Sequence, residues 1–192
     1  MSSGATDWRW FWYVLEFAEG GGVRLHYADP PYPGQAKKRY AHDPQCAEVD
    51  HAALIRNLEE SSDGWALSSG ADLAAMRLVI PLLPDGVRVC PWVKPFASFK
   101  PNVTLAYAWE PVYVKPARKR GRELPTVRDW VSANITLKRG LSGAKPEAVC
   151  FWLFDALGAE VGDDFSDLFP GTGGVGRAWR TWNDNPLRRL VG

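Results

Sequence analysis

The first half of the chain changes repeatedly between the two-residue period of a strand and the 3.6-residue period of a helix. Residues 23–28 alternate apolar and polar side chains, which indicates a strand. Residues 53–58 carry apolar side chains at helical spacing, and Asp50 can cap that helix. The same periods predict strands at 64–68, 87–93 and 103–114, the last of which Pro111 could interrupt. Residues 71–83 have helical spacing until Pro81 stops the helix. This alternation predicts an α/β fold with a mainly parallel sheet and helices on both its faces.

Two more helices are predicted in the last third of the chain. The first begins at residues 145–146, where proline suits the first turn, and ends at Gly158. The segment 163–169 follows, and the glycine-rich turn after it leads into a helix whose apolar face runs from Val175 to Trp182. No internal repeat and no long linker divides the chain, so we expect one domain over residues 1–192.

Composition limits the classes of protein to which the chain can belong. A chain of 192 residues can bury roughly 70% of its unfolded surface, and a hydrophobic content of 46% argues against disorder. A net charge of +1 argues against a generally basic nucleic-acid wrapper, although local patches stay open. The three cysteines and three histidines show no disulfide or metal-ligand spacing, so we expect no metal site and a reducing, intracellular setting.

Residues 1–22 are expected to form an N-terminal extension rather than a membrane anchor. The aromatic run from Trp8 to Phe17 contains Arg9 and Glu16 and is far shorter than the ~20 apolar residues that a span needs. It also lacks the basic start and the small-residue cleavage site of a secretory signal. We therefore expect a packed N-terminal element and a cytoplasmic protein without membrane contact; an interfacial anchor is the alternative.

A proline-rich tetrapeptide follows the first predicted strand: Asp29, Pro30, Pro31 and Tyr32. Proline has a fixed φ and no N–H, so the strand must end in a fixed loop. A second candidate site is the glycine-rich turn over residues 167–173, where backbone N–H groups can approach a ligand closely. Taken singly, each segment could also be a plain turn at the end of a strand.

Together, these segments resemble the motifs of AdoMet-dependent amino-methyltransferases. In that family a Lys-Pro helix precedes a Gly-Asp turn, a strand and the motif Asp-Pro-Phe-x-Gly-x-Gly. Residues 145–146, 162–163 and 167–173 have that order here. The tetrapeptide at 29–32 matches the family's catalytic Asp-Pro-Pro-Tyr, and its place ahead of the AdoMet motif matches the permuted, beta-type order of DNA adenine N6-methyltransferases. Residues 89–94, Val-Cys-Pro-Trp-Val-Lys, resemble the Trp-x-Lys strand of that order.

The resemblance covers roughly residues 23–114 and 143–182 and implies a single-domain, three-layer Rossmann-like methyltransferase sheet. It implies AdoMet as cofactor and DNA as partner. The Asp29 carboxylate and the Pro30 carbonyl would accept the two N–H groups of the target amine, with Pro31 fixing the loop and Tyr32 stacking on a flipped-out base. The residues implied for cofactor binding are Lys145, Pro146, Asp167, Phe169, Gly171, Thr172 and Gly173.

The family's separate target-recognition domain is not evident, and a basic loop region at 115–142 is expected in its place. Two basic clusters are expected to contact phosphates. They are Lys37, Lys38, Arg39, Arg118, Lys119, Arg120 and Arg122. A solvated charge run is the alternative. This compact form suits a phage or a mobile element, and thus a bacterial or phage-infected host cell.

Other functions stay open at this point. After the last predicted helix, no strand carries an acidic residue that could bind the AdoMet ribose, so a non-catalytic methyltransferase-like module that binds nucleic acid or protein is one alternative. The acceptor could also be cytosine N4 or an adenine in RNA or single-stranded DNA, although Asp29 favours adenine because cytosine enzymes often have serine there. A second copy of the chain or a partner subunit could complete the pocket.

Overall fold

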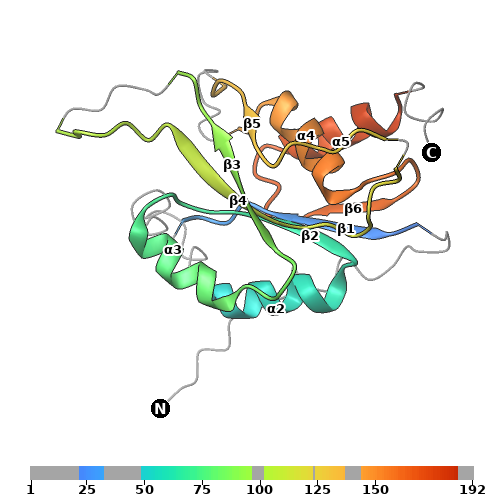
Figure 1. Ribbon diagram of the computed structural model, residues 1–192, viewed down its shortest axis with the longest axis horizontal. Coiled ribbons are helices and arrows are strands. Elements are labelled where there is room, and N and C mark those ends of the chain that lie inside the picture. Colours follow the sequence, from blue (N-terminus) through green and yellow to red (C-terminus); the bar gives the residue numbers. More distant parts are fainter. Residues whose placement is uncertain (1–21, 33–48, 97–101, 123, 137–143, 186–192) are drawn as a thin grey trace, which may run out of the picture.

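The structure is a computed structural model that describes residues 22–32, 49–96, 102–122, 124–136 and 144–185. One mixed sheet lies between two layers of helices (Figure 1). In chain order the elements are β1 (Arg24–Ala28), α2 (His51–Ser61), β2 (Gly64–Ser68), α3 (Leu73–Val79), the short 3-10 turn η2 (Ile80–Leu82), β3 (Arg88–Val93), β4 (Trp109–Lys115), β5 (Val131–Ser132), α4 (Glu147–Leu157), β6 (Asp164–Asp167) and α5 (Gly174–Asn183). The N-terminal extension lies outside the described residues, apart from Gly22.

The strand order of the sheet is β5-β3-β4-β2-β1-β6. β1 pairs in parallel with both β2 and β6, whereas β4 is antiparallel to both β2 and β3. Every described strand except β4 therefore runs in the same direction, which confirms the mainly parallel sheet predicted from the sequence. The carboxyl ends of β1, β2 and β6 meet along one edge, here called the carboxyl edge, and their starts lie along the opposite, amino edge.

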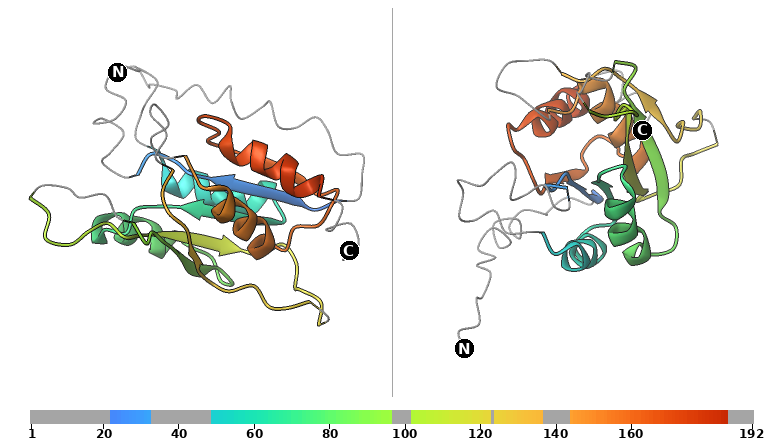
Figure 2. Two further views of the ribbon diagram at one scale, coloured as in Figure 1. Left: turned by 90° about the horizontal axis from the view of Figure 1, so that it is seen from above. Right: turned by 90° about the vertical axis from the view of Figure 1, so that its left-hand side faces the viewer.

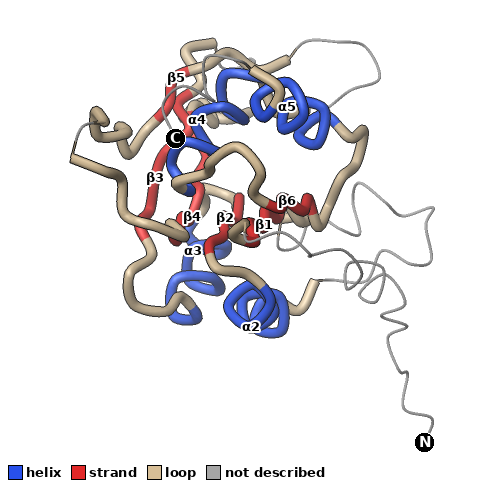
Figure 3. The backbone as a smooth tube through the Cα atoms, turned by 90° about the vertical axis from the view of Figure 1, so that its right-hand side faces the viewer, coloured by secondary structure: helices blue, strands red, loops and turns tan. Residues whose placement is uncertain are grey.

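Two apolar cores hold the three layers together, one on each face of the sheet. Figures 2 and 3 show the helices on the two faces of the sheet. α4 and α5 cover one face, where Phe154 and Leu157 are fully buried. α2 and α3 cover the other face, where Leu58 and Val79 are fully buried. Every residue of β2 is buried, as expected for a central strand covered on both faces.

The predicted helices form, and their ends follow from local side-chain chemistry. The Asp50 carboxylate accepts a hydrogen bond from the Ala53 N–H at 3.0 Å, which confirms the predicted cap of α2. Pro146 is the N-cap of α4 rather than part of its first turn. Gly158 ends α4 with φ 74°, a conformation that L side chains rarely adopt.

One predicted strand starts later than expected, because β4 begins at Trp109 rather than near residue 103. Pro111 does not interrupt it. The Pro111 carbonyl accepts from the Ser69 N–H at 3.2 Å, so the backbone of Pro111 faces β2. Pro111 therefore lies opposite Pro91 of β3 where no β3–β4 hydrogen bond is needed, and neither proline removes a bond between these two strands.

β6 forms although its sequence is mostly polar. It is the outermost described strand on its side of the sheet and pairs with β1 alone, so its alternate side chains can stay in contact with solvent. Its one apolar side chain, Phe165, meets Phe154 edge-on at 5.0 Å and stacks on Trp179 at the same centroid distance. These aromatic contacts join β6 to α4 and α5 and compensate for the weak strand pattern.

The region 115–142 is largely loop where it is described, but it also contains the end of β4 and all of β5. Arg118 within it corrects a sequence prediction, because its guanidinium is not available for phosphate. It donates to both oxygens of Asp163, at 2.6 and 2.9 Å, and to the Gly158 carbonyl at 2.9 Å. Burial acts to raise the pKa of Asp163, but hydrogen bonds from Arg118 and from the backbone outweigh it and hold that pKa below its ordinary value.

Replacing Arg118 with alanine should lower the free energy of unfolding by about 2–3 kcal/mol, because the Asp163 charge would stay buried without its partner. Lys119→Ala, at the exposed neighbouring position, should change it by less than about 0.5 kcal/mol. Because the pKa of Asp163 is lowered in the fold, the stabilisation is complete above the pKa of the unfolded carboxyl and disappears as the pH falls through the folded value. Denaturant titration at pH 7 measures both variants, and equal effects would contradict this role for Arg118.

Candidate active site

The two motifs found in the sequence lie side by side at the carboxyl edge. Tyr27 of β1 is the register partner of Asp167 of β6, and the Leu168 N–H donates to the Tyr27 carbonyl at 2.8 Å. The Asp29–Tyr32 loop leaves the sheet directly after β1, and the glycine-rich turn leaves it directly after β6. Two loops more than a hundred residues apart in the sequence therefore leave the sheet side by side.

Four charged side chains meet beside the first loop. Lys145, just before α4, places its Nζ 3.0 Å from Oδ2 of Asp29 and 3.3 Å from Oε2 of Glu110. Glu110 lies on β4, and its other carboxylate oxygen accepts from Lys94, which follows β3. The side chain of Lys145 is only 6% exposed, so this pairing takes place largely out of water. Two carboxylates and two ammonium groups thus form one compensated cluster, here called the charged cluster.

Aromatic side chains enclose the charged cluster. The ring of Trp92 lies 4.7 Å from Nζ of Lys94 and 5.2 Å from Nζ of Lys145, within the range of cation–π contact. The Trp92 indole N–H donates to the Ala133 carbonyl at 2.9 Å, which fixes the ring. The Tyr32 hydroxyl lies close enough to the Glu110 carboxylate for each to shift the pKa of the other. The last residue of the Asp-Pro-Pro-Tyr loop is therefore connected to β4.

The electrostatics of this edge follow from burial and from the neighbouring charges. Burial raises the pKa of Asp29, while Lys145 opposes that rise. Burial also acts to raise the pKa of Glu110, but Lys145 and Lys94 together bring it below its ordinary value. Burial would lower the pKa of Lys145, yet Asp29, Tyr32 and Glu110 more than reverse this, so Lys145 stays charged. Burial, and then the Asp29 charge, raise the pKa of Asp167 to about 6.

The glycine-rich turn has the backbone geometry that requires glycine. Gly171 has φ 46° and Gly173 has φ 71°, both in the left-handed region. The Gly173 N–H donates to the Pro170 carbonyl at 2.6 Å and closes the turn directly before α5. The first N–H groups of α5 therefore point away from the helix toward the carboxyl edge, where they favour an anionic group.

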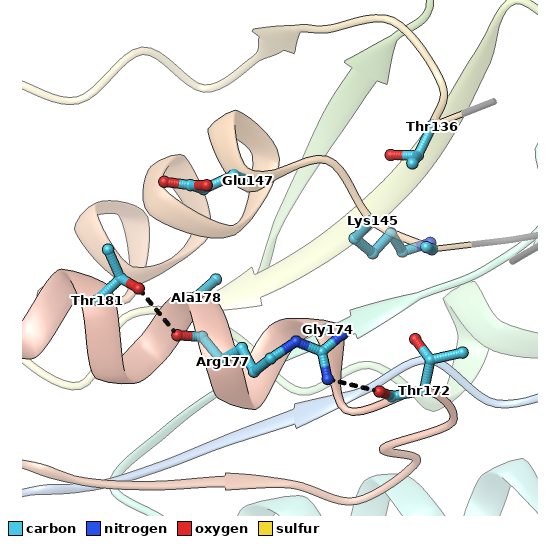
Figure 4. A pocket seen from close by; sticks show the side chains of 9 residues that line it. Thr136, Lys145, Glu147, Thr172, Gly174, Arg177, Ala178 and Thr181 are labelled. Atoms are coloured by element: carbon cyan, nitrogen blue, oxygen red, sulfur yellow. Dashed lines mark hydrogen bonds between the residues drawn. The ribbon is translucent and has the colours of Figure 1, made fainter. Parts of the chain in front are cut away.

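A cavity of about 240 Å³ lies between this turn and the start of α4 (Figure 4). Its lining is mostly polar and includes Lys145, Glu147, Thr172 and Arg177. The Arg177 side chain turns back along α5 and donates to the Thr172 carbonyl at 2.8 Å. Lys145 belongs both to this cavity and to the charged cluster, so the cavity adjoins Asp29.

The structure brings together only some of the residues predicted from the sequence. The Asp29–Tyr32 loop, Lys145 and Thr172 gather at the cavity and the charged cluster. Phe169 does not line the cavity; it packs with Leu168 against the core on the α2 side. The expected phosphate ligands Lys37, Lys38 and Arg39 lie outside the described residues.

The second basic cluster lies at the other edge of the sheet. β4 runs against its neighbours, so the loop after Lys115 starts at the amino edge, where the Ala117 N–H donates to the Leu157 carbonyl at 3.0 Å. Lys119, Arg120 and Arg122 are exposed there. The length of β1 separates them from Asp29, about 16 Å at ~3.3 Å per residue.

Sequence reasoning missed Glu110 and Arg177 and gave Lys94 no role beyond its place in a strand motif. Glu110 carried a signal, since it is the one charged residue between Trp109 and Val114 in a strand that is otherwise apolar. Arg177 looked like the polar face of an amphipathic helix, and nothing in its spacing set it apart. Trp92, singled out by its Trp-x-Lys strand, does lie at the site.

The described ranges contain neither a candidate metal site nor a candidate membrane span. No group of three or more His, Cys, Asp and Glu side chains is arranged to hold a metal ion among these residues. None of the helices in the described part of the chain has the length and apolar character to cross a membrane.

The raised pKa of Asp167 predicts a pH-dependent gain in stability from Asp167→Asn. A carboxyl with a folded pKa of about 6 and an unfolded value of 3.8 resists ionisation in the fold, so it costs stability above pH 6 and nothing below pH 3. Asparagine keeps the oxygen that accepts from the Phe169 N–H at 3.2 Å but carries no charge. The variant should be about 2–3 kcal/mol more stable at pH 8 and nearly unchanged at pH 4. Asp164→Asn, at an exposed position of the same strand, is the control; equal gains would contradict this assignment.

The fold has relatives among solved structures, although no protein-family model and no curated protein matches the chain. The crystal structure of the M1.HpyAVI-SAM complex superposes with a TM-score of 0.56 at 15% identity, covering 84% of this chain and 79% of that one. The crystal structure of M1.HpyAVI gives 0.51 at 15% identity, with 85% and 78% covered. Together with the strand order, these similarities show that the chain shares the Rossmann-like fold of the two structures.

Proposed function

We propose that the protein is an AdoMet-dependent methyltransferase that methylates the N6 amine of adenine in DNA, with relaxed or very short sequence preference. The observation that carries this proposal is the parallel pairing of β1 with β6. It places an Asp-Pro-Pro-Tyr loop and a glycine-rich turn at one edge, with a polar cavity between α4 and α5 beside them. Donor and acceptor sites must adjoin in this way for direct transfer of a methyl group.

The cavity suits the methionine part of AdoMet. Its volume of about 240 Å³ is below the ~300–1,000 Å³ of typical ligand pockets, so it fits one end of the molecule. Arg177 and the first N–H groups of α5 would hold the carboxylate, and Glu147 would pair with the ammonium group. When bound, AdoMet supplies an electrophilic methyl group on a sulfonium. The SAM present in the M1.HpyAVI complex, which has the same fold, supports this assignment.

Asp29 and Pro30 would activate the amine of the acceptor. An exocyclic amine is a weak nucleophile because its lone pair is delocalised into the ring. Hydrogen bonds from its two N–H groups to the Asp29 carboxylate and the Pro30 carbonyl concentrate electron density on nitrogen. Both groups are held before the acceptor arrives, Asp29 by Lys145 and Pro30 by its buried position and fixed φ. As the bond from nitrogen to the methyl carbon forms, the bond from that carbon to the sulfonium sulfur would break, so that the demethylated thioether leaves. Nitrogen would become more positive beside Asp29 and then lose one of its two protons to solvent.

Tyr32 would stack on the base. Its ring lies against the start of the β2–α3 loop, where a Cβ built on Gly70 would be 3.5 Å from Tyr32 Cδ2. The next residue, Ala71, lines a second hollow of about 370 Å³ with Asp72 and the exposed Trp109. An aromatic wall beside Tyr32 suits a base that has left its helix, and stacking of this kind contributes about 1–3 kcal/mol per base.

Lys119, Arg120 and Arg122 are proposed as phosphate contacts distant from the target base. The strand β1, which runs from the amino edge to Asp29, is ~16 Å long and would match about five stacked nucleotides at ~3.4 Å each. These side chains would position the nucleic-acid strand without reading its sequence. Arg118, held by Asp163, is no longer part of this set.

Two variants should separate cofactor binding from methyl transfer. Asp29→Asn should lower transfer of a tritiated methyl group by about 10²–10³-fold, because the amide accepts hydrogen bonds poorly and no longer balances Lys145. It should still bind AdoMet in calorimetry. Arg177→Ala should weaken AdoMet binding about tenfold by removing a charge-assisted contact to the carboxylate. Arg180→Ala, exposed on the same helix, should have no effect on binding.

The same assays decide among the alternatives. Wild-type protein that gives no heat with millimolar AdoMet or with its demethylated product would favour a non-catalytic binding module. Transfer measured on plasmid, single-stranded DNA and RNA ranks the acceptors, and identification of the methylated base distinguishes adenine N6 from cytosine N4. An Asp29→Asn protein as active as wild type would disprove the mechanism.

The phosphate contacts predict an effect that depends on strand length. The triple variant Lys119→Ala, Arg120→Ala, Arg122→Ala should bind a 12-nucleotide strand more weakly and with a shallower dependence on salt, because up to three released counterions are lost. It should bind a trinucleotide that carries the target base as well as wild type does. Fluorescence anisotropy from 50 to 200 mM salt measures both ligands, and unchanged affinity for the longer strand would remove these residues from the interface.

A further inference from the structure

Lys145 is shared between two carboxylates, which is the unusual feature of the charged cluster. Its Nζ lies 3.0 Å from Oδ2 of Asp29, which follows β1, and 3.3 Å from Oε2 of Glu110, which lies on β4. Lys94 occupies the remaining oxygen of Glu110. Glu110 therefore binds both ammonium groups, whereas Asp29 binds one.

The cost of such a cluster argues for a role beyond stability. The side chains of Lys145, Lys94, Glu110 and Asp29 are only 6, 11, 18 and 23% exposed. Buried ion pairs contribute little net stability, and well-packed apolar residues often do as well or better. Their advantage is a fixed arrangement of charges. Here that arrangement surrounds the carboxylate proposed to activate the amine.

The position of Glu110 is itself well determined. Glu110 is the register partner of Trp92, so the two side chains lie on the same face of the β3–β4 pair. The Trp92 ring lies within about 5 Å of both ammonium groups, at 4.7 and 5.2 Å. The Tyr32 hydroxyl also lies close enough to Glu110 for the two groups to shift each other's pKa. Glu110 thus connects a strand to both ends of the Asp29–Tyr32 loop, through Lys145 at one end and directly at the other.

We propose that Glu110 is a positioning residue for methyl transfer, which holds Lys145 and Tyr32 in place around Asp29 and balances the second ammonium charge. This inference rests on the proposed function. A carboxylate can accept about four hydrogen bonds, so Asp29 can bind Lys145 through Oδ2 and still accept from an amine. Lys145 divided between two carboxylates withdraws less electron density from Asp29 than it would if it bound Asp29 alone.

Charge balance gives a second reason for the same role. With Glu110 present, the two carboxylates neutralise the two ammonium groups. Without it, the cluster would carry one net positive charge beside a sulfonium donor and an amine that is becoming positive. Transfer moves the positive charge from the sulfonium sulfur to the amine nitrogen, which would lie beside Asp29 and therefore nearer to the cluster. An uncompensated ammonium group in the cluster would thus oppose the transition state more than the ground state.

Removing Glu110 must also change the titration of Asp29. Several charged or titratable groups face Asp29 from the elements packed against it. They are Lys145, Lys94, Glu110, Tyr27, Tyr32 and Asp167. Among them the Glu110 charge raises the pKa of Asp29, and Lys145 lowers it. Without Glu110, the charge that raises the pKa of Asp29 is gone, and Lys145, which lowers it, has no second carboxylate to bind. The pKa of Asp29 should therefore fall.

The test compares Glu110→Gln with a matched control, Glu59→Gln. Glu59 pairs with Lys115 at the amino edge and is also part-buried, so its variant breaks a similar ion pair far from the site. We expect Glu110→Gln to lower kcat at least tenfold, to change the AdoMet dissociation constant less than about threefold, and to move the acidic limb of the kcat/KM profile to lower pH. Glu110→Asp, which keeps the charge, should recover part of the wild-type kcat. The acidic limb of its kcat/KM profile should lie at the same pH as in wild type. Glu59→Gln should change none of these values.

The failure of this inference is distinguishable from failure of the proposed function. Carbon-13 NMR titration of the Asp29 carboxyl needs no turnover and should give a lower pKa in Glu110→Gln than in wild type. An unchanged Asp29 titration, or a kcat equal to that of wild type in a folded Glu110→Gln protein, would overturn the role of Glu110 while leaving the methyltransferase intact. Wild-type protein that transfers no methyl group to any acceptor would instead overturn the proposed function.

Discussion

The pairing of β1 with β6 is the constraint on which the site depends. These strands are separated by most of the chain, yet they lie next to each other and run in parallel, so that both send their loops out at the same edge. Parallel strands can only be joined by a long connection, and here that connection contains β2–β5 and their helices. The fold therefore closes around the site: the first described strand carries the Asp-Pro-Pro-Tyr loop, and the last carries the glycine-rich turn.

The ion pairs at the two edges of the sheet differ in their arrangement. At the amino edge, Arg118 pairs with Asp163 directly before β6, and Lys115 of β4 pairs with Glu59 of α2. Arg118 also lies 3.7 Å from the exposed Glu160 carboxylate, but its two short carboxylate contacts are both to Asp163, so the buried Asp163 charge is satisfied in place. At the carboxyl edge, Lys145 serves two carboxylates at once and borders a polar cavity. A shared cation leaves capacity for hydrogen bonds to a ligand, which is what a binding site requires.

The packing of α4 and α5 on one face of the sheet determines the geometry of the cavity. α4 and α5 lie on the same face, and their N-terminal ends border the cavity, where helix dipoles and free N–H groups favour an anionic group. The aromatic cluster of Phe154, Phe165 and Trp179 holds these two helices against β6. Packing on this face thus fixes the distance between Lys145, which precedes α4, and the glycine-rich turn, which precedes α5.

The sequence alone determined the elements and the two motif loops, because hydrophobic periods, caps and proline or glycine conformations are local properties. Residues 64–68 and the Asp50 cap are examples in which pattern and structure agree. Only the tertiary structure decided which charges meet. Arg118 looked like part of an exposed basic run until Asp163 was found beside it, and Glu110 was one polar residue in a strand until Lys94 and Lys145 converged on it. Coulombic partners are set by distance in space, and strand order, which no local pattern encodes, fixes that distance.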